Sequence, residues 1–293
     1  MKQFVGTGVA LITPFTEDRK VDYKALEKLV NYQIDNGIDY LVVQGTTGEQ
    51  ATLSANERTQ VREAIVAVNN AKLPLVLGIG GNCTQAVIDE IKTANLEAFD
   101  AILSVAPYYN KPTQEGFYQH FSAIAKVCPK PIILYNVPGR TAKNIAPETI
   151  FRLASDFDNI IALKEAGNSV HQYLQLIKNK PDDFLIISGD DDLVLGVVLA
   201  GGAGVISVIG QAFPKEFATM IQLGIEGKAK QAYQIHYQLM DCINLIFEEN
   251  NPAGIKALLK EKKLCEPFVR LPLVEASKQL QQKIHGFVDN YRA

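Results

Sequence analysis

The stretch Asn159-Ile-Ile-Ala-Leu-Lys164-Glu-Ala-Gly-Asn168 is the starting point for predicting the fold of this 293-residue chain. Its consecutive apolar residues indicate a buried strand, and Lys164 stands at the carboxyl end of that strand. A lysine in such a place is poorly solvated, which favours the neutral amine over the charged ammonium. A neutral amine can attack a ketone and form a Schiff base. Fully buried lysines are rare, however, so the rest of the sequence must decide whether Lys164 is reactive or marks the exit of the strand into water.

Short apolar runs alternate with helical patterns on both sides of this stretch. The runs that predict strands are 4–13, 40–44, 75–79, 101–105, 132–135, 160–164, 184–188 and 205–208. The patterns that predict helices are 23–36, 55–70, 85–96, 115–127, 147–155, 170–178, 193–200 and 215–225, and Asp22 and Ser54 stand at expected N-caps. Eight such units with nearly continuous apolar strands predict an α/β fold of the closed (β/α)8 TIM-barrel type. The alternative, an open doubly wound sheet, lacks the Gly-x-Gly-x-x-Gly that should follow its first strand.

The strand pattern stops after Gly227. Residues 229–248, 253–261 and 274–291 then predict a C-terminal appendix of three helices. We therefore expect two domains, a catalytic barrel over residues 1–226 and a helical domain over residues 227–293.

Composition and charge exclude several classes of protein. With 47% hydrophobic and 21% charged residues the chain resembles an ordinary globular protein. A net charge of -3 and the lack of any basic run argue against a nucleic-acid partner. The cysteines and histidines are scattered without metal-ligand spacing, so we expect reduced thiols, a cytoplasmic location, no metal and no other cofactor.

Two apolar stretches require a test for membrane insertion. Residues 4–15 could form the apolar part of a signal peptide, but no typical cleavage site follows. Residues 193–213 are uncharged and long enough to cross a bilayer. This second stretch is interrupted by Gly201, Gly202 and Gly204, which favours a helix, a tight turn and a buried strand. We expect no membrane partner.

Polar residues gather after the predicted strands, and in a TIM barrel the segments after the strands share the catalytic rim. Each segment has an ordinary structural explanation, such as a tight turn, a packed tyrosine, a surface arginine or a helix N-terminus. Together they supply an amine, phenols, hydroxyls and a guanidinium. That set suits carbanion chemistry at a ketone, with Lys164 forming an imine and Arg140 binding a carboxylate in bidentate fashion.

Six of these motifs, in this order, resemble the dihydrodipicolinate synthase family, which belongs to the pyruvate-dependent class I aldolases together with N-acetylneuraminate lyase. The motifs are Gly45-Thr-Thr-Gly-Glu49, Tyr108-Tyr-Asn-Lys-Pro112, Tyr135-Asn-Val-Pro-Gly-Arg-Thr141, Lys164-Glu-Ala166, Ser188-Gly-Asp190 and Gly204-Val-Ile-Ser207. The resemblance covers essentially the whole chain, and Gly139-Arg140-Thr141 distinguishes it from the lyase branch. It implies the condensation of pyruvate with L-aspartate 4-semialdehyde in the diaminopimelate route to lysine.

The resemblance also implies catalytic roles. Lys164 would form the imine with pyruvate. Tyr135, Thr46 and Tyr109 would form a proton relay, and in the family the residue equivalent to Tyr109 reaches in from a neighbouring subunit. Members of the family are mostly homotetramers, built as a dimer of dimers.

Substrate-binding roles follow from the same resemblance. Thr47 and the main chain of Ile206 would hold the carboxylate of pyruvate, and Arg140 would hold that of the semialdehyde, with Gly189 and Asp190 near its other end. Two alternatives remain open. One is another pyruvate-dependent lyase or aldolase that acts on a longer 2-keto acid, and the other is a catalytically silent barrel that serves in binding or assembly.

One region departs from the pattern of family members that are inhibited by L-lysine. Those members use histidines after the Gly-Thr-Thr-Gly-Glu motif, where this chain has Ala55 and Arg58. They also use a glutamate where this chain has Ala86. Because a bound cation without a paired anion is unfavourable, we predict that L-lysine inhibits this protein weakly or not at all.

Overall fold

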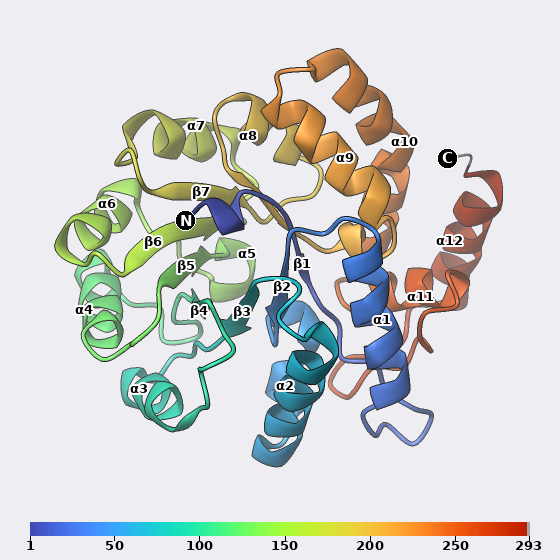
Figure 1. The fold of residues 1–293 in the computed structure, drawn as a ribbon, viewed down its shortest axis with the longest axis horizontal. Coiled ribbons are helices and arrows are strands. Elements are labelled where there is room, and N and C mark those ends of the chain that lie inside the picture. The colour runs from blue at the N-terminus through green and yellow to red at the C-terminus, as the bar shows by residue number, and fades with distance from the viewer. Residues whose placement is uncertain (292–293) are drawn as a thin grey trace.

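The computed structural model describes residues 1–291, and within this range eight parallel strands pair in sequence order until β8 closes on β1 (Figure 1). The strands are β1 Gly6–Ala10, β2 Tyr40–Val43, β3 Leu75–Gly78, β4 Ala101–Val105, β5 Ile132–Asn136, β6 Ile160–Glu165, β7 Leu185–Ser188 and β8 Gly204–Ser207. The predicted TIM barrel is therefore confirmed.

Helices follow the strands and surround the barrel. They are α1 Tyr23–Asp35, α2 Ala55–Asn69, α3 Thr84–Thr93, α4 Gln114–Ala125, α5 Pro138–Thr141, α6 Pro147–Asp156, α7 Val170–Asn179, α8 Val194–Leu199 and α9 Pro214–Ile225. The predicted N-caps are confirmed, since Asp22 accepts a hydrogen bond from the Ala25 amide and Ser54 one from the Glu57 amide.

Several predicted boundaries were wrong by up to a few residues, and two of them have a clear physical reason. The first strand was expected over residues 4–13 but covers only Gly6–Ala10. Beyond it the chain leaves the sheet, because the Ile12 amide donates to the Gln211 side chain at 2.9 Å instead of to a neighbouring strand. The last helix was expected from residue 274 but begins at Lys278, where Ser277 caps it. The short helix α5 was not predicted at all.

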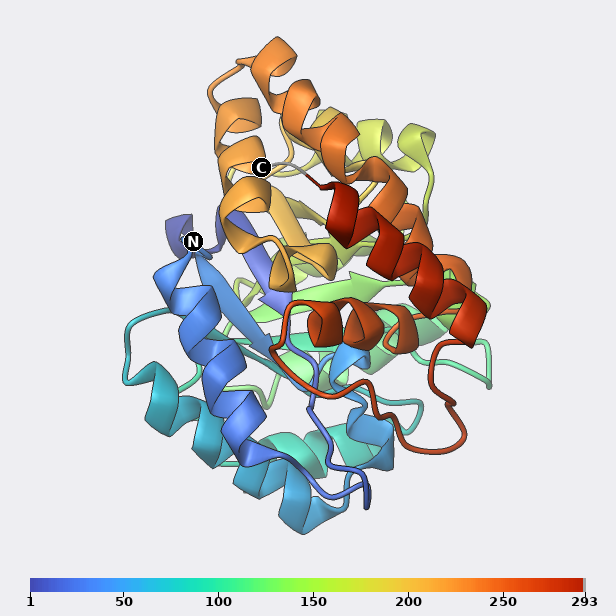
Figure 2. The same ribbon diagram turned by 90° about the vertical axis from the view of Figure 1, so that its right-hand side faces the viewer.

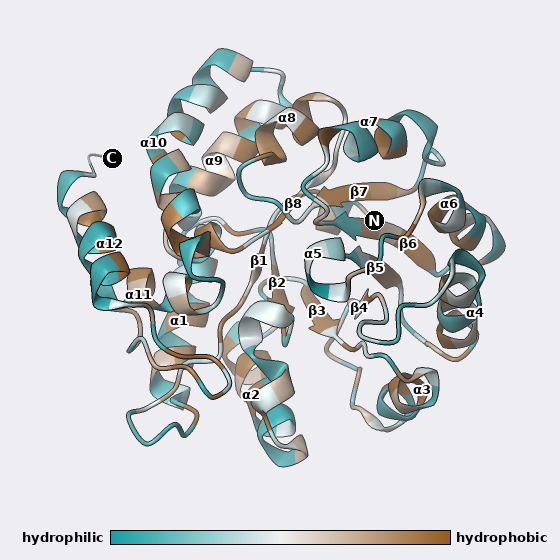
Figure 3. Ribbon diagram, turned by 180° about the vertical axis from the view of Figure 1, so that it is seen from behind, coloured by the Kyte–Doolittle hydropathy of each residue, from teal (hydrophilic) through white to brown (hydrophobic). Residues whose placement is uncertain are grey.

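Alternate residues of each strand face opposite sides, and this parity builds two apolar layers. In β5, for example, Ile133 and Tyr135 belong to a cluster inside the barrel, whereas Ile132 and Leu134 pack against the helices. Figure 3 shows the strands as a largely hydrophobic centre. On the same inward side, Lys164 stands near the carboxyl end of β6 and Tyr135 near that of β5, so these two polar groups lie at that end of the barrel interior.

Helices α10 Ala229–Glu248, α11 Ala253–Glu261 and α12 Lys278–Asn290 lie side by side against one flank of the barrel (Figure 2). Their apolar residues continue the core of the barrel helices, and α10 packs along α9. A buried ion pair joins this segment to the barrel, with the Lys256 Nζ 2.5 Å from Glu49 Oε1. Among the helices described here, none combines the length and the apolar character needed to cross a membrane.

Candidate active site

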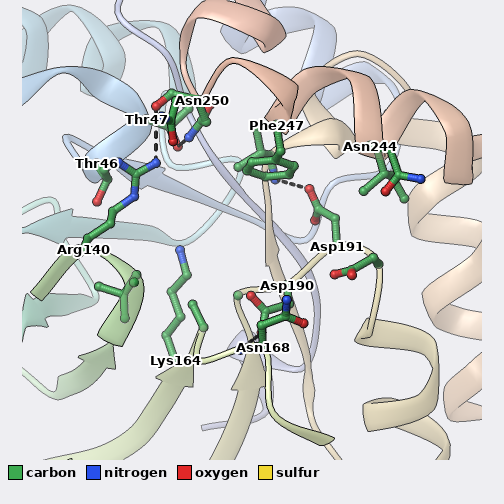
Figure 4. Close-up of a pocket in the computed structure, with 18 of the residues that line it drawn as sticks. Thr46, Thr47, Arg140, Lys164, Asn168, Asp190, Asp191, Asn244, Phe247 and Asn250 are labelled. Carbon is green, nitrogen blue, oxygen red and sulfur yellow. Dashed lines mark hydrogen bonds between the residues drawn. The ribbon is translucent and has the colours of Figure 1, made fainter. Parts of the chain in front are cut away.

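A cavity of about 540 Å³ lies at the carboxyl ends of the strands (Figure 4). One wall comes from the barrel and the other from α10 and the residues that follow it. The barrel side includes Thr46, Thr47, Tyr135, Arg140, Lys164, Gly189 and Asp190. Seven of the nine sequence-predicted site residues therefore line one cavity.

Lys164 reaches this cavity because of strand parity. It lies in β6 opposite Tyr135 of β5 and Ile187 of β7, on the inward side of the barrel. The residue is only 6% exposed, and its Nζ lies 4.4 Å from the centre of the Tyr135 ring. Figure 4 shows the Lys164 side chain pointing into the space between Arg140 and Asp190. An amine held in this way can meet a carbonyl carbon that binds beside the Tyr135 phenol.

Gly189 gives Lys164 the room that it needs. A Cβ on Gly189 would stand 2.9 Å from Lys164 Cε and 2.7 Å from the Ala166 Cβ. Any larger side chain would therefore displace the amine.

The threonine pair sits on a single 3-10 turn, Thr46–Gly48, after β2. Thr46 is exposed to the cavity, whereas Thr47 is 3% exposed and its Oγ1 accepts a hydrogen bond of 2.8 Å from the Asn251 side chain. The turn is anchored on its far side, because Thr13 Oγ1 donates to the carbonyl of Gly48 at 2.7 Å. Both hydroxyls are thereby held on the rim of the barrel.

Arg140 lies on α5, a one-turn helix that Pro138 begins directly after β5. Its Nη2 donates to the main-chain carbonyl of Asn251 at 3.3 Å. The guanidinium is otherwise exposed, so its remaining N–H groups can bind a carboxylate in the cavity.

Asp190 and Asp191, the first two of three aspartates after β7, differ in their roles. Asp190 accepts hydrogen bonds from the Asn168 amide and the Tyr173 hydroxyl, both at 3.0 Å, and burial raises its pKa to about 6. Asp191 is fully buried, accepts from the amides of Val208 and Ile209, and has a pKa that burial raises above its usual range. Asp190 faces the cavity as a polar group whose charge is sensitive to pH, whereas Asp191 fixes the loop after β8.

Glu165 points away from Lys164, to the outer side of the barrel. Its carboxyl group accepts from the Asn136 side chain at 2.9 Å and from the Gln172 side chain at 2.8 Å. Burial raises the pKa of Glu165 to about 7 in spite of these bonds. This network ties β5, β6 and α7 together directly behind the reactive lysine.

Two predicted site residues do not line the cavity. Ile206 is buried in β8, opposite Gly8 of β1, and its side chain belongs to the inner apolar cluster. Its predicted role concerns only its main chain. Tyr109 is 88% exposed on the loop after β4, outside the cavity of its own chain.

The sequence analysis missed the opposite wall of the cavity. This wall comes from Ile243, Asn244, Phe247, Glu248, Asn250 and Asn251. The one local signal is the pair of amides before Pro252, where the helical pattern breaks between 229–248 and 253–261. Such a break usually indicates only a loop, so it does not point to a site.

Comparison with known proteins agrees with this geometry. A model of the Dihydrodipicolinate synthetase family matches residues 3–290. The 4-hydroxy-tetrahydrodipicolinate synthase of Flavobacterium psychrophilum is 55% identical over 287 residues, which cover 98% of this chain and 98% of that protein.

Two solved structures are similar over nearly the whole chain. The chloride-inhibited dihydrodipicolinate synthase of Acinetobacter baumannii, complexed with pyruvate, is 38% identical with a TM-score of 0.95 and 98% coverage of both chains. A dihydrodipicolinate synthase described as the first monomeric variant is 36% identical with a TM-score of 0.95, covering 98% of this chain and 96% of that one. Since the family model and these relatives span almost every residue, the chain belongs to the dihydrodipicolinate synthetase family.

Proposed function

We propose that this protein condenses pyruvate with L-aspartate 4-semialdehyde through a Schiff base on Lys164 and forms 4-hydroxy-tetrahydrodipicolinate, in the diaminopimelate route to lysine. The observation that carries this proposal is the buried Lys164 amine, which faces one cavity together with Tyr135, two threonine hydroxyls and Arg140. The close relatives that carry this enzyme name support the same activity.

The chemistry follows from these groups. The Lys164 amine adds to the keto carbon of pyruvate, water leaves, and an iminium ion forms. The iminium withdraws electrons, so a proton can leave the methyl group and give an enamine, whose carbon attacks the aldehyde of the second substrate. The Tyr135 ring lies beside the Lys164 amine in the same cavity, so we assign the proton transfers of these steps to its phenol, with Thr46 as the next member of the relay.

The two carboxylates require separate donors. We assign the carboxylate of pyruvate to Thr47 and the main chain of Ile206, and that of the semialdehyde to Arg140. Gly189 and Asp190 lie near the other end of the semialdehyde. Bidentate binding by Arg140 would fix the orientation of the aldehyde relative to the enamine.

We also propose that the protein is a homotetramer, a dimer of dimers, and acts in the cytoplasm. The exposure of Tyr109, at 88%, supports its donation to a neighbouring subunit. A relative described as monomeric shows that assembly needs its own test. The unpaired state of all four cysteines supports a reducing compartment.

The test is chemical trapping. Pyruvate and borohydride together should add a stable mass to the peptide that contains Lys164. In a separate assay, the untreated enzyme should consume aspartate semialdehyde in the presence of pyruvate. Cleavage of sialic acid or keto-deoxy sugar acids without condensation would instead favour another lyase of the same superfamily. Absence of any adduct in well-folded protein would refute imine chemistry and favour a silent barrel.

A further inference from the structure

We propose that Asn251, which comes from the C-terminal helical segment, is a positioning residue that orients the hydroxyl group of Thr47 toward the substrate. Asn251 follows α10 and is 5% exposed, yet it lines the cavity. Its Nδ2 donates to Thr47 Oγ1 at 2.8 Å across a separation of 204 residues. This inference rests on the proposed role of Thr47 in binding the carboxylate of pyruvate.

The direction of this hydrogen bond matters because a threonine hydroxyl has a single proton. An amide N–H can only donate, so it occupies a lone pair of Thr47 Oγ1 and leaves the hydroxyl proton free. Within residues 1–291 no protein group accepts that proton. A carboxylate can only accept, so a threonine whose proton faces the cavity is suited to bind one.

Asn251 also contacts the second group that we assign to carboxylate binding. Its main-chain carbonyl accepts from Arg140 Nη2 at 3.3 Å. One residue from outside the barrel thus touches both Thr47 and Arg140. The side chain acts on the pyruvate end of the cavity and the main chain on the semialdehyde end.

A buried ion pair keeps Asn251 in register with Thr47. Lys256 Nζ lies 2.5 Å from Glu49 Oε1, and both side chains are at most 1% exposed. Lys256 also donates to the Phe268 carbonyl at 2.8 Å, and Glu49 Oε2 accepts from the Arg270 amide at 3.0 Å. Glu49 follows the turn that carries Thr47, and Lys256 lies in the first turn of α11, which begins two residues after Asn251. The ion pair therefore joins these two elements.

The opposite orientation of the Asn251 side-chain amide predicts a different effect of mutation on the KM for pyruvate. If the Asn251 side-chain oxygen faced Thr47, the Thr47 hydroxyl would donate its proton to Asn251. That proton would then no longer be available for a hydrogen bond to the substrate. The variant Asn251→Asp distinguishes the two amide orientations, because a carboxylate can only accept a hydrogen bond from Thr47. With Asn251 as donor, this isosteric change should raise the KM for pyruvate more than Asn251→Ala does. A near-normal KM in Asn251→Asp would overturn the inference.

A double-mutant cycle tests whether Asn251 acts through Thr47. Asn251→Ala should raise the KM for pyruvate by about tenfold, as the loss of one well-oriented hydrogen bond to a charged group implies, with a smaller change in kcat. In a Thr47→Val background the same change should alter KM by less than about twofold, because the hydroxyl is already absent. Gln238→Ala, which removes an exposed amide from α10, is the matched control and should leave KM unchanged.

The outcomes distinguish this inference from the proposed function. Borohydride should still trap pyruvate on Lys164 in every variant at saturating pyruvate, and circular dichroism should show the same fold. Equal increases of KM in both backgrounds would overturn the positioning role of Asn251 and leave the imine chemistry intact. Failure to trap pyruvate in the unaltered protein would overturn the proposed function itself.

Discussion

At the scale of single residues, the two buried lysines Lys164 and Lys256 differ in their ion pairing. Within residues 1–291, Lys256 pairs with Glu49, whereas Lys164 forms no ion pair and faces the cavity. Lys164→Arg should lower kcat by several orders of magnitude, because the guanidinium stays protonated and cannot attack a ketone. Mass spectrometry after borohydride treatment should find no pyruvate adduct in this variant. An adduct on Lys256 in the unaltered protein would contradict the assignment.

Substitutions of Arg140 and Tyr135 should impair different steps of the reaction. Arg140→Ala should still form the pyruvate imine but condense it poorly, because the second carboxylate loses its bidentate partner. Tyr135→Phe should slow the proton transfers themselves, by roughly a hundred- to ten-thousand-fold. Single-turnover kinetics can follow imine formation and condensation separately. If Arg140→Ala abolished the imine and spared condensation of the preformed enamine, the roles would be reversed.

At the scale of elements, α2 and α3 carry the region that departs from lysine-inhibited members of the family. Arg58 would repel a bound cation through its like charge, but its Nη1 lies 3.4 Å from Glu90 Oε2, and this ion pair offsets much of that repulsion. Ala86 still supplies no carboxylate. We therefore expect weak or no inhibition by L-lysine.

A titration of L-lysine at fixed pyruvate and semialdehyde checks this prediction. Half-inhibition well below about 1 mM, equivalent to more than roughly 4 kcal/mol of binding, would show that another acidic group replaces the missing one. Ala86→Glu is the informative variant, and it should increase the sensitivity to lysine.

The network around Glu165 joins β5, β6 and α7 and should make stability depend on pH. Burial raises the pKa of Glu165 from its usual value of 4.5 to about 7. The folded protein therefore holds this proton more tightly than the unfolded chain. The resulting stability is present below about pH 4.5 and is lost as the pH rises through about 7.

Glu165→Gln should remove this dependence. Between pH 5 and 8 the free energy of unfolding of the unaltered protein should fall by up to roughly 3 kcal/mol more than that of the variant. Asp190, whose pKa is also raised, is present in both proteins, and its charge contributes to the raised pKa of Glu165. The difference therefore reports the titration of Glu165 in the presence of Asp190. Urea unfolding at several pH values measures it, and parallel profiles would contradict the prediction.

At the scale of the whole molecule, the exposed Tyr109 leads to a prediction about assembly. If a neighbour donates this phenol, an isolated subunit has an incomplete proton relay and should be nearly inactive. Sedimentation and activity should be measured at the same protein concentrations, and activity should fall as the protein dissociates. Tyr109→Phe should impair the assembled enzyme to a similar degree. Fully active monomers would contradict this role.

The barrel and much of its catalytic rim could be predicted from the sequence, because both depend on local patterns. Apolar runs of strand length and helical periodicity gave the order of the elements. The sequence also predicted that the segments after the strands share one rim, and in the structure Tyr135 of β5 and Lys164 of β6 are direct neighbours in the sheet. The ends of some elements were predicted wrongly, since the departure of residue 12 from the sheet depends on Gln211, which is 199 residues away.

Only the tertiary structure decided what completes the cavity. The hydrogen bond from Asn251 to Thr47 and the ion pair between Lys256 and Glu49 each join residues more than 200 positions apart. Contacts at such separations leave no periodic signal in the sequence, because they depend on how finished elements pack. The raised pKa of Glu165 has the same origin, since burial is a property of the neighbours that folding brings around the carboxyl group and not of the residue itself.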